Sequence, residues 1–259
     1  MGLLGTDKER PVLNEEVRNS VIKRRIDFIK THPVWRSQYS AFVKAVAQLR
    51  IPPGATALSV SCGDGTWDFL AVSANPNLRR IIATDVVDCP VSAEDVRLLQ
   101  TKTAWSFQKV PPDMVLPLDD DCCRLVLHQD VLEHTKKPFL LLKENHRVLE
   151  RGGYLLCGTP NIFRPANIAK LLIGKLTFPC GLYRVAPGAG SLLPSEMIHV
   201  QEFNQYQLRT MLEESGFNLL SMIHCFFGIS FLKIKFCDFP NGNSGRNLCQ
   251  YIFCVAQKC

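Results

Sequence analysis

Short apolar runs alternate along most of the chain with segments whose apolar residues recur at helical spacing. A run of strand length followed by an amphipathic helix, repeated several times, predicts an α/β fold built on a mostly parallel sheet. A helix over 205–214 precedes two last apolar runs. The expected strands cover residues 57–60, 80–84, 104–108, 124–129, 154–158, 219–227 and 248–256, with intervening helices near 93–99 and 138–150.

The first 50 residues have a helical pattern without strand-like runs. Ile22, Ile26 and Ile29 repeat at helical spacing, His32-Pro33 interrupts the pattern, and it then resumes to about residue 49. Pro52-Pro53-Gly54 follows as a break. We therefore expect residues 1–50 to form an N-terminal helical cap, ahead of one main domain over residues 51–259.

A glycine-containing turn follows the first expected strand. Gly63 and Gly65 let the backbone turn sharply and let a ligand approach it closely. The second expected strand ends in Asp85, where a carboxylate can accept hydrogen bonds from both ribose hydroxyls. A dinucleotide fingerprint needs a third glycine at position 68, and Asp68 stands there instead. The turn therefore predicts a nucleotide-type ligand, with NAD less favoured.

From about residue 57 to residue 217 the chain resembles the class I S-adenosylmethionine (SAM) dependent methyltransferases, in particular their type 11 branch. The resemblance is densest over residues 113–161. It is carried by the motifs Ala-Leu-Ser-Val-Ser-Cys-Gly-Asp-Gly-Thr at 57–66, Asp-Met-Val-Leu-Pro-Leu at 113–118, Val-Leu-His-Gln-Asp-Val-Leu-Glu-His at 126–134, Arg-Val-Leu-Glu-Arg-Gly-Gly-Tyr-Leu-Leu at 147–156 and Thr-Pro-Asn at 159–161.

The resemblance implies an enzyme with a Rossmann-like, seven-stranded, mostly parallel sheet flanked by helices and closed by an antiparallel C-terminal hairpin. It also implies SAM as the methyl donor. Asp85 could instead cap a helix or turn, and Asp113 follows Pro111-Pro112 in a good turn sequence. The donor-binding residues that the resemblance implies are Ser61, Gly63, Gly65, Asp85, Asp113, Met114 and Gln129.

Two histidines lie where the methyl group and the acceptor are expected. His134 follows the fourth strand and could act as a base for an oxygen acceptor, or it could be a structural feature of the family. His199 could border the acceptor pocket, or it could cap or pack the next helix. His128, inside a strand, is expected in the core with its hydrogen bonds satisfied. No metal site is expected.

Three residues depart from the family pattern. Ser59 stands where an acidic residue is usual, Ser61 where glycine is usual, and Arg124 where aspartate is usual. The loss of a carboxylate at residue 59 bears on the methionine end of the donor pocket. A weakened donor site, or a non-catalytic interaction protein related to the enzymes, is therefore an open alternative.

Residues 161–200 interrupt the strand–helix alternation. An amphipathic helix near Ile168 to Leu176 is followed by a glycine- and proline-containing run at residues 187–191. Because an excursion after the fifth strand lies above the ligand-binding edge of the sheet, it could form a lid over the acceptor. A surface extension without substrate contact is the alternative.

Charge adds a question about partners. The net charge is +6, and the first 50 residues hold ten Lys and Arg against five Asp and Glu. This excess could be a solvated helix face, or it could contact an anionic membrane or, less favoured, a nucleic acid. Met1-Gly2-Leu3-Leu4-Gly5-Thr6 fits the N-myristoylation pattern, and the basic Lys23-Arg24-Arg25 could be a second membrane signal.

Composition is ordinary for a globular protein, with 46% hydrophobic and 21% charged residues. The eleven cysteines contain no CxxC pair, and no secretory signal is visible, so we expect reduced cysteines in a cytoplasmic protein. The apolar run over 219–232 is too short to span a membrane. The favoured function is SAM-dependent methylation of a small-molecule or lipid-like acceptor. A protein- or RNA-directed methyltransferase is the second hypothesis.

Overall fold

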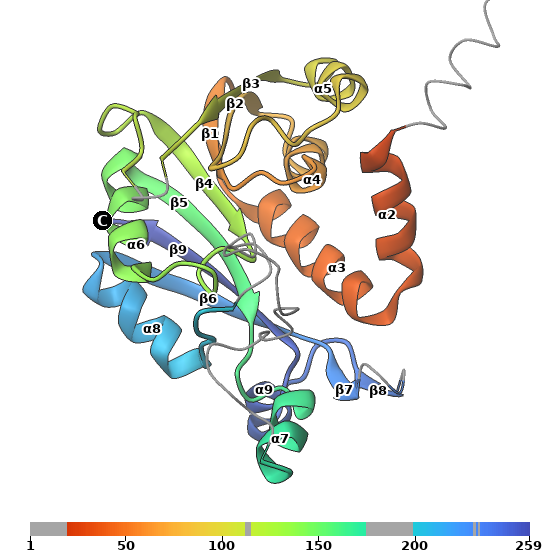
Figure 1. The fold of residues 1–259 in the computed structure, drawn as a ribbon. Coiled ribbons are helices and arrows are strands. Elements are labelled where there is room, and N and C mark those ends of the chain that lie inside the picture. The colour runs from red at the N-terminus through yellow and green to blue at the C-terminus, as the bar shows by residue number, and fades with distance from the viewer. Residues whose placement is uncertain (1–19, 112–114, 175–198, 230–231, 233) are drawn as a thin grey trace, which may run out of the picture.

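The computed structural model describes residues 20–111, 115–174, 199–229, 232 and 234–259. Its centre is a seven-stranded sheet with the strand order β3-β2-β1-β4-β5-β9-β6 (Figure 1). The five strands from β3 to β5 are parallel, and β9 runs antiparallel to both β5 and β6. The strands are β1 (Ala55–Val60), β2 (Leu78–Asp85), β3 (Ala104–Lys109), β4 (Cys123–Gln129), β5 (Leu149–Pro160), β6 (Phe217–Cys225) and β9 (Tyr251–Lys258).

Helices cover both faces of this sheet (Figure 1). Contacts join α3 to α4, β6 and β9 on one side, and α6 and α8 to β5, β6 and β9 on the other. The α/β architecture expected from the sequence is therefore confirmed, together with its antiparallel closing strands. The helices are α2 (Val21–Thr31), α3 (Pro33–Gln48), α4 (Thr66–Ala74), α5 (Ala93–Gln100), α6 (Pro138–Val148), α7 (Pro165–Leu172), α8 (Gln205–Glu214) and α9 (Asn243–Asn247).

The central strands are apolar on both faces because helices bury both. Along β1, Ala57 packs with the helices α2, α3 and α4, while the next residue, Leu58, packs with α6 and α8. All of Ala57 and Leu58 is buried. Period-two alternation sends neighbouring residues to opposite faces, so a continuous apolar run marks a strand buried on two sides.

The two N-terminal helices pack into the same core as the sheet. The helix α2 ends at Thr31 and α3 begins at Pro33, so the chain turns at the predicted break. Ser20 caps α2 and also donates a 2.5 Å hydrogen bond to the buried carboxylate of Asp95 at the start of α5. Phe42 of α3 is fully buried and contacts Trp67 of α4 at a ring-centroid distance of 4.8 Å. Buried apolar and polar contacts thus attach the first two helices to α4 and α5.

The C-terminal region differs from its sequence prediction in detail. The last strand begins at Tyr251 rather than at residue 248, because Leu248 caps the short helix α9. A separate two-stranded sheet, β7 (Phe227–Ile229) and β8 (Ile234–Cys237), lies between β6 and α9 and was not predicted. These strands are too short to carry a recognisable alternation.

The predicted lid region is described only in part. Its helix α7 forms over Pro165–Leu172, whereas residues 175–198 lie outside the described part. Among the described residues, no helix is both long and apolar enough to cross a membrane. The ten cysteines of the described part are all free.

Candidate functional site

The turn after β1 brings backbone groups to the carboxyl edge of the sheet. Cys62 N donates to Thr84 O at 2.9 Å, and Gly65 N donates back to Cys62 O at 3.0 Å. Gly65 is the N-cap of α4 with φ +78°. A Cβ there would lie 3.2 Å from the Leu99 side chain. Glycine is therefore favoured at this position both by the left-handed backbone conformation and by the close packing.

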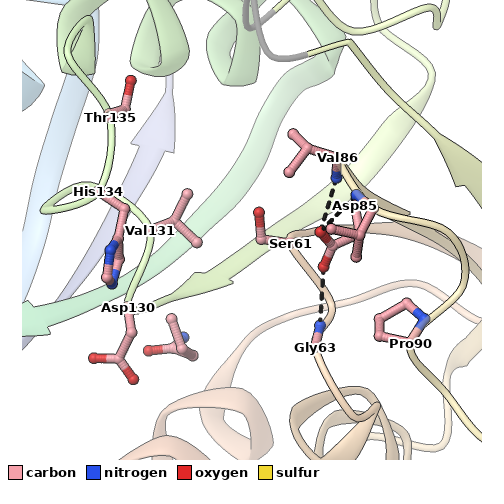
Figure 2. A pocket seen from close by; sticks show the side chains of 11 residues that line it. Ser61, Gly63, Asp85, Val86, Pro90, Asp130, Val131, His134 and Thr135 are labelled. Atoms are coloured by element: carbon pink, nitrogen blue, oxygen red, sulfur yellow. Dashed lines mark hydrogen bonds between the residues drawn. The ribbon is translucent and has the colours of Figure 1, made fainter. Parts of the chain in front are cut away.

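Asp85 ends β2 beside this turn. Its Oδ2 accepts a 3.3 Å hydrogen bond from Gly63 N, and its Oδ1 accepts a 2.8 Å hydrogen bond from Val86 N (Figure 2). The side chain is therefore oriented by the backbone at the rim of a cavity that it lines. One carboxylate has more acceptor positions than these bonds use, so Asp85 can also accept from a ligand.

The cavity between β1, β2 and β4 has a volume of about 380 Å³, which is within the range of small-molecule sites. Figure 2 shows its walls as two groups, with Gly63, Asp85 and Pro90 on one side and Asp130 and His134 on the other. The lining residues are Ser61, Gly63, Asp85, Val86, Val87, Pro90, Gln129, Asp130, Val131, His134 and Thr135.

Four of the predicted donor residues meet in this cavity, namely Ser61, Gly63, Asp85 and Gln129. Ser61 has φ +53°, a left-handed conformation that favours glycine, so its backbone keeps the geometry expected of the glycine usual there. Gly65 is buried at the N-terminus of α4, against Leu99 and Val91, and is not among the lining residues. Asp113 and Met114 lie outside the described residues.

A buried donor group on Gln129 has no partner among the described residues. Its Nε2 is buried and makes no hydrogen bond, while its Oε1 accepts from Tyr251 Oη at 3.4 Å. A buried polar group without a partner is costly, and a ligand that accepts a hydrogen bond removes that cost. This atom therefore favours an acceptor group, such as a carboxylate, in the cavity.

The loop after β4 connects this cavity to a second one. Asp130 has φ +56° and lines both cavities. The second cavity has a volume of about 510 Å³, and it is bounded by the α2–α3 junction, the end of β5 and the start of β9. Its lining residues are His32, Val34, Trp35, Gln38, Asp130, Pro160, Arg164, His199, Gln250 and Tyr251. The two predicted histidines thus separate, with His134 at the first cavity and His199 at the second.

His134 and His199 nevertheless lie in contact, with ring centroids 4.9 Å apart and planes at 89°. Together with Glu133 they bring one ligand atom each to within 4.8 Å of one another, so these three side chains could hold a metal ion. No metal site was expected from the sequence because the cysteine spacing showed none, but this cluster contains no cysteine. It forms because the fold brings residue 199 beside residues 133 and 134.

Burial governs the electrostatics of this loop. Burial raises the pKa of Glu133 well above its ordinary value, and the nearby charge of Asp130 raises it further. Burial also raises the pKa of Asp130, although a hydrogen bond from Tyr251 and the charges of His134 and His199 act in the opposite direction. The region gathers the buried Glu133, the partly exposed Asp130 and two partly exposed imidazoles, a concentration of titratable groups that is typical of functional sites.

The buried ion pair of Glu202 and Arg164 contacts the His199 ring at Nδ1. Glu202 Oε1 contacts His199 Nδ1 at 2.7 Å and Arg164 Nη2 at 2.6 Å, while Asn167 donates to Glu202 Oε2 at 2.7 Å. Only 3% of Glu202 is exposed. Burial acts to raise the pKa of Glu202, but its hydrogen bond with His199 and the charge of Arg164 outweigh burial and lower it. Glu202 is thus an ionised acceptor that orients the His199 ring.

The three departures from the family pattern lie away from the cavity walls, except for Ser61. Ser59 is buried within β1, and Arg124 pairs with Glu150 at 3.1 Å near the opposite end of β4. His128 is in the core as expected, but neither ring nitrogen has a hydrogen-bond partner among the described residues. The prediction that the ring of His128 has its hydrogen bonds satisfied is therefore wrong. Burial lowers the pKa of His128 to about 3.

Asp130, Glu133 and Tyr251 were not singled out from the sequence. The position of Asp130 directly after Gln129, at the end of a central strand, is a signal that could have found it. Glu133 was visible only as part of a motif. Tyr251 could not have been found, because β9 reaches the site only through its antiparallel pairing with β5.

Comparison with known proteins agrees with this geometry. A family model described as a methyltransferase domain matches residues 34–222, which is well over half of the chain. The chain is 28% identical over 150 residues to a demethylmenaquinone methyltransferase of Bacillus licheniformis. That match covers 58% of this chain and 59% of the relative, so the chain spans about three fifths of the relative's length.

Solved structures share the fold at low sequence identity. A SAM-dependent methyltransferase of Thermotoga maritima superposes with a TM-score of 0.56 at 15% identity, covering 95% of this chain and 99% of that one. One from Aquifex aeolicus superposes with a TM-score of 0.53 at 14% identity, covering 92% and 97%. At these identities the likeness concerns the fold alone.

Proposed function

Because the chain belongs to the class I SAM-dependent methyltransferases, in their type 11 branch, we propose that it methylates a small-molecule or lipid-like acceptor. One observation carries the proposal. Asp130 lines both the cavity beside Asp85 and the larger cavity beside His199, so a donor in the first would adjoin an acceptor in the second. Methyl transfer is an in-line displacement, and two adjoining cavities supply the alignment that it needs.

In this proposal the first cavity holds SAM, which supplies an activated methyl group on its sulfonium. Asp85 accepts hydrogen bonds from the ribose hydroxyls, and Ser61 and Gly63 face the methionine end. The free Gln129 Nε2 donates to the amino-acid carboxylate. Space around Gly63 supports this assignment, since a Cβ built there meets no atom within 4 Å.

The acceptor side must orient the nucleophile, keep water out and, for a hydroxyl, remove a proton. His134 lines the first cavity at the boundary with the second, which supports its role as the base. His199 lines the second cavity and is held by Glu202, which supports a role in positioning the acceptor.

Apolar surface on α7, the helix that begins at the second cavity, supports a lipid-like acceptor. Arg164 lines that cavity and is the N-cap of α7. At the other end of α7, Leu171, Leu172 and Ile173 are 59%, 81% and 65% exposed. Such residues can contact an apolar chain that extends beyond the cavity. The quinone named for the Bacillus licheniformis relative is an acceptor of this kind.

Peripheral membrane contact by a cytoplasmic enzyme is a further part of the proposal. On α2, Arg24, Arg25 and Phe28 are exposed, a combination of basic and apolar groups that suits an anionic membrane surface. The N-myristoylation motif at Gly2, which would add a second signal, lies outside the described residues.

Calorimetric titration with SAM and S-adenosylhomocysteine tests the donor site. Asp85→Asn should weaken SAM binding about 100-fold, because a charged acceptor for two hydroxyls is lost. Asp88→Asn is the matched control, since Asp88 lies three residues away and its side chain is 95% exposed. Equal SAM affinity of wild type and Asp85→Asn would refute the donor assignment, and no binding to folded wild type would favour the non-catalytic alternative.

Transfer of a labelled methyl group tests the acceptor class. We expect incorporation into a long-chain quinol in detergent, and weaker incorporation into its short-chain analogue. Total RNA and a protein extract serve as competing acceptors. Incorporation into RNA or protein alone would overturn the small-molecule proposal and support the second hypothesis.

A further inference from the structure

Three side chains from separate segments converge between the two cavities. Glu133 and His134 follow β4, while His199 lies 65 residues further along the chain. Backbone and side-chain hydrogen bonds hold the segments together, from Gln201 N to Glu133 O at 3.3 Å and from Gln201 Nε2 to Thr135 O at 3.4 Å. Glu133 is fully buried, and both histidines are partly exposed. The cluster is therefore built by the fold and remains accessible from one side.

The orientation of His199 is set by its neighbour Glu202. Both oxygens of Glu202 already accept hydrogen bonds, from Arg164 and Asn167, so Glu202 is also the acceptor in the 2.7 Å contact and Nδ1 of His199 is the donor. The lone pair of Nε2 is then free for another partner. A histidine whose second nitrogen donates to a carboxylate is the usual arrangement of a metal-ligating imidazole.

Glu133 offers a second ligand atom. Thr159 Oγ1 donates to Glu133 Oε2 at 2.8 Å, whereas no N–H or hydroxyl group of the described residues donates to the buried Oε1, and the carboxyl of Asp130 lies beside Glu133. A buried carboxylate oxygen without a donor is unfavourable unless a cation or a proton compensates it. With His134 and His199 nearby, a cation would use this oxygen together with two imidazoles.

We propose that Glu133, His134 and His199 bind a divalent cation of the Zn²⁺ class, with an open coordination position facing the two cavities. Two histidines and one glutamate, with a fourth position left to water or substrate, form one of the ligand sets of catalytic zinc. The ligand atoms lie within 4.8 Å of one another, and side-chain rotation can bring them to the shorter separations of a coordinated ion.

The open position would take the acceptor oxygen, an extension that rests on the function proposed above. With His134 as a ligand, the cation would replace it as the group that activates the acceptor. It would lower the pKa of a coordinated hydroxyl, whose O–H bond would break as the proton passes to solvent through the second cavity. The oxygen then forms a bond to the methyl carbon as the bond from carbon to sulfur breaks, leaving neutral S-adenosylhomocysteine. The substrate class is therefore a hydroxylated acceptor, such as a phenol or quinol.

Direct titration of the chelator-treated full chain tests the cation site without SAM or acceptor. Calorimetry with Zn²⁺, Mn²⁺ and Mg²⁺ should show one site that prefers Zn²⁺. His199→Gln and Glu133→Gln should abolish that binding, and Glu202→Gln should weaken it by about 10- to 100-fold through loss of the outer hydrogen bond. His146→Gln is the control. His146 lies on α6 and packs against Phe217 of β6, so this variant should leave cation binding unchanged.

The visible spectrum of the Co²⁺-loaded protein gives a second readout. We expect the absorption of a four- or five-coordinate ion in wild type and in His146→Gln, and its loss in His134→Gln. Circular dichroism and the SAM titration of each variant show that it is folded. A spectrum unchanged by His134→Gln, or absence of stoichiometric binding by any of these cations, overturns the proposal.

The two proposals can fail separately. Full methyl transfer in excess chelator by protein that binds no cation would overturn the cation site and leave the methyltransferase function intact. Cation binding that requires Glu133 and His199, without transfer to any hydroxyl acceptor, would support the site and overturn its proposed role with the acceptor.

Discussion

The two sides of the candidate site are built by different physical means. The side made by β1 and β2, here called the donor half, consists of a tight turn and Asp85, held by backbone hydrogen bonds. The side made by the loop after β4 and the segment around His199, here called the acceptor half, is held by buried charged side chains such as Glu202 and Arg164. Backbone geometry is local in sequence, whereas charge networks join distant segments.

This difference has consequences for how each half responds to change. A backbone-built half tolerates side-chain substitution as long as φ and ψ are kept. A half built on buried charge loses much free energy when one partner is removed, because the other charge is left without compensation. Four variants test the contrast, beginning with the largest expected effect.

Glu202→Ala should be the most damaging of these changes. It leaves Arg164, whose side chain is 12% exposed, without its carboxylate, and it also releases His199. We expect a loss of about 3–5 kcal/mol in the free energy of unfolding, which lowers Tm by about 10 °C. Urea and thermal unfolding measure both quantities.

Glu213→Ala is the matched control for that variant. Glu213 pairs with Arg209 at 3.4 Å, and both side chains are more than half exposed. Its loss should change the free energy of unfolding by about 0.5 kcal/mol or less. Equal effects of the two variants would show that buried charge does not hold the acceptor half together.

Asp68, on α4 directly after the turn of the donor half, is a buried charged group next to this backbone-built half. Its ionisation should make the stability of the protein depend on pH. Burial raises the pKa of this carboxyl to about 6, while hydrogen bonds with Ser59 and Trp105 act in the opposite direction. In the unfolded chain Asp68 ionises near pH 4. The stabilisation of the folded state by protonated Asp68 is therefore fully present below pH 4 and is lost as the pH rises through about 6. The loss corresponds to about 3 kcal/mol.

Asp68→Asn should remove this pH dependence, because asparagine keeps an acceptor for the 2.8 Å hydrogen bond from Trp105 Nε1 but does not ionise. The difference in unfolding free energy between wild type and variant should therefore change by about 3 kcal/mol between pH 4 and pH 8, in favour of the variant at pH 8. Parallel pH curves would contradict the raised pKa. Asp88→Asn, at an exposed position, should follow the wild-type curve.

Gly158→Ala tests the packing of β5 against Gln129 and Tyr251, which lie between the two halves. A Cβ at Gly158 would lie 2.6 Å from Tyr251 Cε1 and would collide with Gln129 Oε1. We expect a loss of about 1–3 kcal/mol of stability and weaker SAM binding, because Gln129 must move. Gly242→Ala is the control, since a Cβ there meets nothing within 4 Å. Unchanged SAM affinity in Gly158→Ala would exclude Gln129 from the donor site.

Ser61→Gly should have the smallest effect, and a favourable one. Ser61 has φ +53°, where a Cβ costs about 1 kcal/mol relative to glycine, so the variant should unfold at higher urea concentration. Ser106→Gly is the opposite control, because glycine inside strand β3 should destabilise by about 0.5–1 kcal/mol. A destabilised Ser61→Gly would show that the serine side chain, rather than backbone geometry, shapes this turn.

The sequence predicted the donor half more fully than the acceptor half. Asp85 was recognised as the last residue of β2, and Gly63 as part of the turn after β1, because the apolar pattern of both strands is local and continuous. His134 and His199 were both singled out, but their contact was not predicted, nor was the buried Glu202 that orients His199. The two short strands β7 and β8 escaped prediction because three or four residues carry too little pattern.

What the sequence determined by itself is the succession of the seven strands of the main sheet, the break at His32-Pro33 and the strand-end position of Asp85. These features depend on periodicity, backbone conformation and spacing, which are properties of neighbouring residues. Only the tertiary structure decided that Tyr251 lies beside Gln129 and that His199 reaches Glu133 and His134. Those contacts join residues 65 or more positions apart, and they depend on which strands pair and on how buried charges are compensated, which no local pattern records.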